Sequence, residues 1–156
     1  MRLHICAVGR LRGGPEKALV DDYLTRCGRT GRALGLGPAT VTEIDDRKAD
    51  GKAAEAEALL RAAPDGAMLC ALDERGVTMT SPDFAARLGR WRDDGAQNAA
   101  FVIGGADGLD RTVLDRADLI LSFGAMVWPH MLVRVMLAEQ LYRAAGILAG
   151  TPYHRV

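Results

Sequence analysis

This chain has no excess of positive or negative residues. Its 156 residues include 20 Lys and Arg and 20 Asp and Glu, so the formal net charge is +0. A neutral chain exerts no overall attraction on polyanions such as nucleic acids. Any nucleic-acid partner must therefore be recognised by a local patch of cationic side chains.

Long apolar segments are also missing. The uncharged stretch 119–133 is shorter than the roughly 20 residues that a membrane helix needs, and it contains Pro129 and His130. The apolar run near the N-terminus is too short for a secretion signal. We therefore expect no membrane segment.

Cysteine and histidine are scarce, and their pattern argues against a metal site. Cys6, Cys27 and Cys70 form no CxxC motif, and two of them lie in strand-like runs where a thiol behaves as a small apolar group. The three histidines are scattered, and no HExxH sequence is present. The sequence thus predicts a protein of the reducing cytoplasm that needs no metal ion.

Two common nucleotide-binding signatures are absent as well. The pattern GxGxxG fails at Gly104 because Ala106 occupies the position of the second glycine, and no GxxxxGK[ST] sequence occurs. NAD and ATP are therefore poor candidates for a ligand.

What the chain does contain is an alternation of strand-like and helix-like segments. With 49% hydrophobic and 26% charged residues it has the composition of a soluble globular protein, and its length fits one domain over 1–156. Strands are expected over 3–8, 40–44, 68–72, 99–103 and 119–122, and helices over 16–26, 52–63, 83–93, 110–117 and 131–145. Ser81 and Asp110 are expected to cap two of these helices, and Gly146 to end the last. The alternation predicts an α/β fold with a mostly parallel sheet flanked by helices.

The last helix has only a narrow polar stripe. A helix that is apolar nearly all round is buried on more than one side. A second copy of the chain would cover the far side, which favours a two-fold homodimer. The alternative is a central core helix in a monomer.

Glycine-containing loops follow three of the expected strands, over 72–76, 104–108 and 123–128. Parallel sheets bind ligands beyond the carboxyl ends of their strands, and glycine lets a ligand approach the backbone closely. These loops predict a ligand pocket. The alternative is that the glycines serve turn geometry alone.

Taken in order, the segments LHICAVGR, LDERG, FVIGGADGL, LSFGAMVWPHMLVRVMLAEQLYRA and PYHR closely resemble the RlmH family, within the SPOUT superfamily of knotted methyltransferases. The resemblance covers essentially the whole chain. It implies an α/β-knot fold with a C-terminal trefoil knot, an obligate homodimer, and S-adenosyl-L-methionine as methyl donor. It also implies methylation of N3 of a pseudouridine in helix 69 of 23S ribosomal RNA, on assembled ribosomes.

The family's cofactor pocket maps onto the three glycine-containing loops. The residues that the resemblance implies are Leu72, Gly104, Gly105, Phe123, Gly124, Ala125, Met126, Val127 and Trp128. Such loops agree with the chemistry, because adenine needs a flat apolar slot that offers backbone donors and acceptors. For Leu72, Met126 and Val127 the alternative is plain core packing.

Methylation at N3 requires the loss of a proton, so a base, or a cation that stabilises the deprotonated ring, should lie nearby. The candidate catalytic residues are His130, His154 and Arg155. His130 could instead cap the last helix, and the tail could be a frayed terminus.

Substrate RNA is expected to meet aromatic and cationic side chains near the C-terminus, since exposed bases stack on aromatic and guanidinium planes. The candidates are Arg134, Arg143, Tyr153, His154 and Arg155. Arg143 could simply pair with Glu139, four residues before it. Arg10 and Arg12, in the loop after the first strand, are further candidates for phosphate contacts.

A second class of function is compatible with the same features. A non-catalytic regulatory module could hold a nucleotide-like ligand in the pocket and act on a partner. Such a module has no need of the aromatic and cationic tail, so the role of the tail separates the two hypotheses.

Overall fold

We describe the fold from a computed structural model, which describes residues 1–47 and 51–154. The elements in chain order are β1 (Arg2–Val8), α1 (Pro15–Gly31), a short 3-10 helix (Arg32–Leu34), β2 (Ala39–Ile44), α2 (Lys52–Ala62), β3 (Met68–Val77), α3 (Ser81–Asp93), β4 (Asn98–Ile103), α4 (Arg111–Arg116), β5 (Leu119–Leu121) and α5 (His130–Leu148). Every expected strand and helix is present, with changed ends.

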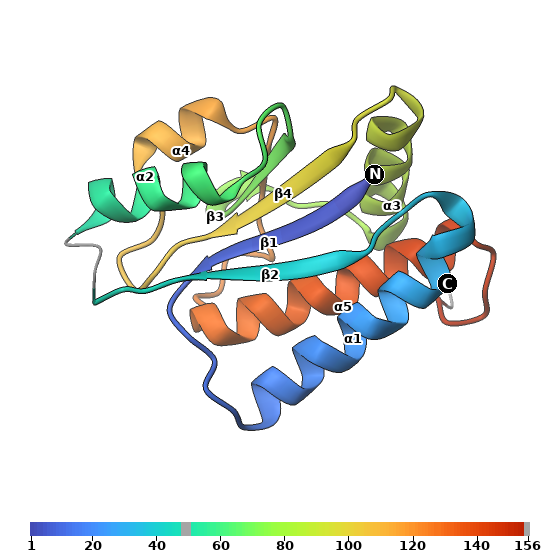
Figure 1. Cartoon of the computed structure of the whole chain (residues 1–156), viewed down its shortest axis with the longest axis horizontal. Coiled ribbons are helices and arrows are strands. Elements are labelled where there is room, and N and C mark those ends of the chain that lie inside the picture. Colours follow the sequence, from blue (N-terminus) through green and yellow to red (C-terminus); the bar gives the residue numbers. More distant parts are fainter. Residues whose placement is uncertain (48–50, 155–156) are drawn as a thin grey trace.

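The elements form three layers. The middle layer is a five-stranded sheet in the order β2-β1-β4-β3-β5, with every neighbouring pair parallel. Helices α2 and α4 cover one face, and α1, α3 and α5 cover the other (Figure 1). The predicted α/β architecture is confirmed. No helix in the described part of the chain is long and apolar enough to span a membrane.

The central strands contribute side chains to the hydrophobic core on both faces of the sheet, because successive side chains of a strand point to opposite faces. In β4, Phe101 and Ile103 pack toward α1, α3 and α5, whereas Ala100 and Val102 pack toward α2 and α4. All four are buried. Burial also raises the pKa of the Cys6 thiol to about 11, so this cysteine stays a protonated core residue.

Helix α5 continues past the predicted stop. Gly146 is not its end but a buried position inside it, where a Cβ atom would lie 3.0 Å from Oγ1 of Thr151. The helix ends at Leu148, and Gly150, which follows the C-cap Ala149, has φ 69°. Hydrogen bonds from Gly150 N to Ile147 O (3.1 Å) and from Thr151 N to Gly146 O (2.9 Å) close this end. The prediction failed because Gly146 serves packing of the following segment rather than helix termination.

The predicted cap of α3 was displaced by one residue. Thr80, not Ser81, is the N-cap, and its hydroxyl accepts a hydrogen bond from Asp83 N at 3.2 Å. Ser81 instead donates to Oε1 of Gln140 on α5 at 2.8 Å. Asp110 caps α4 as expected, accepting from Thr112 N at 2.9 Å.

Strand β3 is longer than predicted because its polar end bends over β5. Leu121 is registered with both Leu72 and Val77, and Ser122 N donates to Val77 O at 2.9 Å. A Cβ atom on Gly76 would lie 2.5 Å from the carbonyl oxygen of Ile120, so the two segments cross in close contact. The trefoil knot that the family resemblance implies in this region stays a prediction.

Candidate active site

A cavity of about 410 Å³ lies at the carboxyl ends of β3, β4 and β5. Its lining residues are Lys52, Leu72, Asp73, Glu74, Arg75, Ile103, Gly104, Gly105, Ala106, Asp107, Gly108, Leu121, Phe123, Gly124, Met126, Val127, Trp128, His130 and Val133. The three predicted loops therefore do meet in one place. All the residues implied for the cofactor line this cavity except Ala125. We call it the donor pocket, after the methyl donor that the family resemblance implies for these loops.

The wall after β4 is made of backbone, because side chains do not fit there. A Cβ atom on Gly104 would lie 2.7 Å from the carbonyl carbon and oxygen of Gly108. A Cβ atom on Gly105 would lie 3.2 Å from Cγ1 of Val8 and 3.3 Å from a carboxylate oxygen of Glu55. Glycine at both positions leaves backbone groups exposed to a ligand.

The loop after β5 is shaped by a serine. Ser122 accepts from Gly124 N at 3.1 Å and donates to Gly124 O at 3.2 Å, and Gly124 has φ 109°. The chain thereby turns away from the sheet and forms the second backbone wall of the donor pocket. Glycine is needed here because its backbone conformation is left-handed.

Core packing does not explain the apolar residues of this loop. Met126 is 70% exposed and Val127 is 85% exposed. Leu72, in contrast, is buried within β3 and lines the donor pocket. The alternative of plain core packing is therefore wrong for the two loop residues.

Charged side chains to which the sequence analysis assigns no role also line the donor pocket. Asp73 accepts from Nε and Nη2 of Arg75, both at 2.8 Å, and from Arg75 N at 2.9 Å. The side-chain hydrogen bond from Arg75 lowers the pKa of Asp73 despite partial burial. Asp73 is therefore an ionised acceptor. Its position directly after a buried strand was the sequence signal that could have found it.

Glu55 of α2 packs against the loop after β4. Burial raises the pKa of this carboxyl, with a further rise from Asp107, while a backbone hydrogen bond from Gly105 opposes the change. Because its oxygens lie next to Gly105, Glu55 helps to fix the backbone wall of the donor pocket.

His130 lies at the mouth of the donor pocket, in the first turn of α5. The N-cap of α5 is Pro129, and no side chain caps this end, so the alternative role of His130 as helix cap is wrong. Its ring lies against Gly9, where a Cβ atom would be 3.4 Å from Nε2 of His130.

The C-terminal tail is docked on α5 and is not frayed up to His154. The Tyr153 hydroxyl donates to Oε1 of Glu139 at 3.1 Å, and the Tyr153 ring lies 4.3 Å from that of Tyr142. Burial and the bond to Glu139 raise the pKa of Tyr153 to about 12. Arg155 lies outside the described residues.

Arg143 holds this tail. Its Nε donates to Oε1 of Glu139 at 2.9 Å, so the pairing predicted as an alternative is confirmed. The guanidinium carbon also lies 4.9 Å from the centre of the Tyr153 ring, and Nη1 is 3.4 Å from Nδ1 of His154.

The structure contradicts the proposed RNA contact of Arg134. This side chain is 0% exposed, and its guanidinium donates to Glu43 and to the carbonyl oxygens of Val8 and Gly9. A fully buried arginine with these partners cannot reach a substrate on the surface. The sequence did not reveal this because the partners come from other parts of the chain.

The two candidate histidines lie along different parts of α5. His130 is at the donor pocket, whereas the tail packs on Glu139, Tyr142 and Arg143. At 1.5 Å rise per residue, the axis between His130 and Tyr142 is about 18 Å long. Within one protomer, the tail and the donor pocket are therefore separate.

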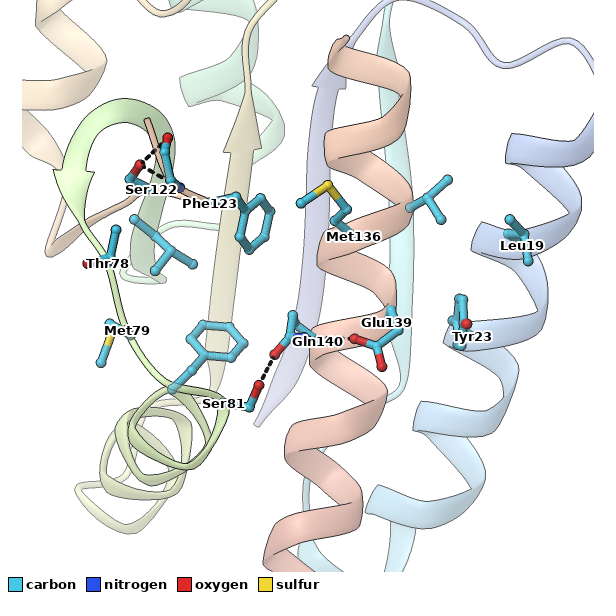
Figure 2. Close-up of a pocket in the computed structure, with 14 residues that line it drawn as sticks. Leu19, Tyr23, Thr78, Met79, Ser81, Ser122, Phe123, Met136, Glu139 and Gln140 are labelled. Carbon is cyan, nitrogen blue, oxygen red and sulfur yellow. Dashed lines mark hydrogen bonds between the residues drawn. The ribbon is translucent and has the colours of Figure 1, made fainter. Parts of the chain in front are cut away.

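A second cavity, of about 480 Å³, lies on the outer side of α5 (Figure 2). Its lining residues are Leu19, Tyr23, Thr78, Met79, Ser81, Phe84, Leu121, Ser122, Phe123, Gly124, Val135, Met136, Glu139 and Gln140. Phe123 and Gly124 also line the donor pocket, so the two cavities share a wall. We call this cavity the α5 groove.

Large apolar side chains beside the α5 groove are exposed. Leu19 on α1 is 44% exposed, and Met131 and Leu132 on α5 are 39% and 40% exposed. Apolar residues that gather on one face commonly mark an interaction surface.

Within the residues that the structure describes, no group of three His, Cys, Asp or Glu side chains could hold a metal ion.

Comparison with known proteins adds a family. Residues 1–154 match the family described as "Predicted SPOUT methyltransferase". The chain is 67% identical over 156 residues to a protein of Dinoroseobacter shibae and 68% identical to one of Ruegeria pomeroyi, covering 100% of each chain. Both are named "Ribosomal RNA large subunit methyltransferase H".

A solved structure shares the fold. It is titled a probable methylase family protein from Haemophilus influenzae Rd KW20, and it superposes with a TM-score of 0.51 at 12% identity. The match covers 99% of this chain and 70% of that one. At this identity the similarity concerns the fold alone.

Proposed function

Because the chain belongs to the SPOUT methyltransferase family, we propose that it methylates large-subunit ribosomal RNA. The target that we propose is N3 of a pseudouridine in helix 69 of 23S rRNA within assembled ribosomes, and the donor is S-adenosyl-L-methionine. The observation that carries the proposal is the donor pocket, where the three glycine-containing loops meet. Since ribosomes are its substrate, the protein acts in the cytoplasm.

The donor pocket fits such a cofactor. Its volume of about 410 Å³ lies in the range of pockets that enclose small organic ligands. Backbone groups of 104–108 and 123–128 would hold the adenine over Leu72, and the ionised Asp73 offers an acceptor for hydroxyl or amino groups of the donor. The donor supplies an electrophilic methyl group on a positively charged sulfur.

The protein must align the acceptor nitrogen, exclude water and remove a proton. His130 lines the donor pocket, and a nitrogen of its ring can accept the N3 proton. Tyr153 offers a ring on which the target base or its neighbour can stack, with Arg143 beside it as a cation. His154 and Arg155 complete the proposed substrate site.

These groups meet only if two copies of the chain cooperate. The tail lies about 18 Å along α5 from His130 in its own protomer. The α5 groove and the exposed Leu19, Met131 and Leu132 give a second copy an apolar face to cover. We therefore propose a two-fold homodimer, in which the tail of one protomer reaches the donor pocket of its partner.

The test is to incubate the protein with methyl-labelled S-adenosyl-L-methionine and ribosomes from cells that lack the enzyme, and then to map the labelled nucleoside. We expect label at N3 of a pseudouridine in helix 69. Label at another base would preserve the reaction and refute the target.

A tail deletion separates the enzyme from a regulatory module. Removing residues 152–156 should preserve donor binding, because none of the described tail residues lines the donor pocket of its own protomer, but should abolish transfer to ribosomes. Full transfer by the truncated protein would remove the role that we assign to the tail. Donor binding by the intact protein with no transfer to any RNA would favour the module.

A further inference from the structure

Arg134 is the one arginine among the described residues that is completely buried. It projects from α5 to the carboxyl ends of β1 and β2. Nη1 donates to Oε1 of Glu43 at 3.0 Å, and Nη2 donates to the carbonyl oxygens of Val8 at 3.1 Å and Gly9 at 3.2 Å. Three elements of the fold are thus joined by a single side chain.

Stability alone does not account for a charge in this place. Burial lowers the pKa of Arg134, with Glu43 opposing the change, and Nε has no hydrogen-bond partner. Replacing a buried ion pair by apolar side chains of similar size is often neutral or stabilising. Whatever its net contribution to stability, Arg134 fixes the position of the groups that it contacts.

The contacts lead to the loop between β1 and α1. Oε1 of Glu43, which Arg134 holds, also accepts from Leu11 N at 2.9 Å. Together with the bond to the Gly9 carbonyl, this fixes the start of the loop 9–14. Gly9, Gly13 and Gly14 all have positive φ angles, so the loop has little conformational restraint of its own.

The loop carries two exposed cations, Arg10 and Arg12. Arg10 has only a partly exposed partner, Asp45, at 3.3 Å, and for Arg12 no ion pair is formed with the described residues. His130 lies against Gly9 at the base of the same loop and lines the donor pocket. The loop that carries the two arginines therefore begins beside a residue that lines the donor pocket.

We propose that Arg134 is a positioning residue, which acts through Glu43 and the Gly9 carbonyl to hold Arg10 and Arg12 against the phosphates of the RNA. This inference rests on the proposed function. Without Arg134 the loop samples other conformations, and the entropy of ordering it must be recovered when RNA binds. The effect falls on RNA binding and leaves the donor pocket intact.

The experiment uses a steady-state assay of methyl transfer to ribosomes at several salt concentrations. The variants are Arg134→Met, Arg134→Lys, the apolar pair Arg134→Met with Glu43→Leu, the pair Arg10→Ala with Arg12→Ala, and the combination of that last pair with Arg134→Met. Arg61→Met, whose side chain is 73% exposed on α2, is the matched control. Unfolding midpoint and dissociation constant of S-adenosylhomocysteine are measured for each protein.

We expect Arg134→Met to raise the KM for ribosomes about tenfold, because the loop must then be ordered when RNA binds. The slope of log KM against log salt should stay near the wild-type value in Arg134→Met, whereas the pair Arg10→Ala with Arg12→Ala should lower it by about two through the loss of two phosphate contacts. Donor binding should match that of wild type. Arg134→Lys should be intermediate, since one ammonium cannot serve Glu43 and the carbonyls together. Adding Arg134→Met to the pair Arg10→Ala with Arg12→Ala should change KM no further.

An unchanged KM in Arg134→Met, or effects that add to those of the two loop substitutions, would overturn the inference. Should Arg134→Met fail to fold, the double variant Arg134→Met with Glu43→Leu takes its place, because it leaves no buried charge unpaired. The same increase in the KM for ribosomes is expected of it. A wild-type protein that binds the donor but transfers no label to ribosomes would refute the proposed function, and this inference with it.

Discussion

Gly104→Ala tests the backbone wall of the donor pocket directly. The new Cβ atom would lie 2.7 Å from two backbone atoms of Gly108 and 3.0 Å from Leu109 N. Favourable carbon contacts begin at roughly 3.5 Å, so the loop 104–108 must move by roughly 0.8 Å. Because backbone atoms cannot rotate away as a flexible side chain can, the whole loop has to shift.

The size of the effect follows from what the loop does. Overpacking of this kind costs about 1–3 kcal/mol of folding stability. Losing one or two backbone hydrogen bonds to the donor costs about 0.5–1.5 kcal/mol each, which weakens binding by roughly 2-fold to 150-fold. We therefore expect a lower unfolding midpoint together with a clearly weaker affinity for S-adenosylhomocysteine.

Titration calorimetry and thermal unfolding, with and without S-adenosylhomocysteine, measure both effects. Gly95→Ala is the control, because Gly95 has φ 92°, nothing lies within 4 Å of its added Cβ, and it is not part of the donor pocket. It should lose about 1–3 kcal/mol of stability through backbone strain but keep the wild-type affinity. Wild-type affinity in Gly104→Ala would refute our assignment of this loop.

Two further predictions concern charge and assembly. The lowered pKa of Asp73 means that it stabilises the native protein above the unfolded value of about 3.9, and that this contribution is lost as pH falls through the lower native value. Asp73→Asn should therefore reduce the change of the urea unfolding midpoint with pH across that acidic window. The same pH dependence as in the wild type would contradict the stabilisation of ionised Asp73 by Arg75. Leu132→Glu should convert the proposed dimer to a monomer in analytical ultracentrifugation, because it places a charge on the apolar face, whereas Ala53→Glu on α2 should not. A stable dimer of Leu132→Glu would exclude that face as the interface.

Much of the site could be predicted from sequence because its signals are local. The strand that ends at Ile103 is followed at once by Gly104 and Gly105, and the strand that ends at Leu121 by the loop 123–128. A parallel sheet brings these ends to one edge regardless of other details. The residues implied for the cofactor therefore gathered in one cavity, apart from Ala125.

Helix ends were less predictable, because they depend on neighbours outside the helix. Gly146 resembles a stop signal but is required by the close approach of Thr151. Ser81 resembles a cap, but Gln140 on a different helix takes its hydroxyl, and Thr80 caps instead. In both cases the local sequence allowed more than one helix end, and packing against other parts of the chain selected the one observed.

By itself the sequence determined the α/β alternation, the glycine loops and the family, since each is encoded in short segments read in order. Only the tertiary structure decided that Arg134 is buried and where the tail docks on α5. Arg134 is buried by Glu43, 91 residues away, and by carbonyls more than 120 residues away. Tyr153 is held on the half of α5 remote from the donor pocket. Such outcomes depend on which distant groups meet in space, and a pattern of neighbours along the chain carries no record of them.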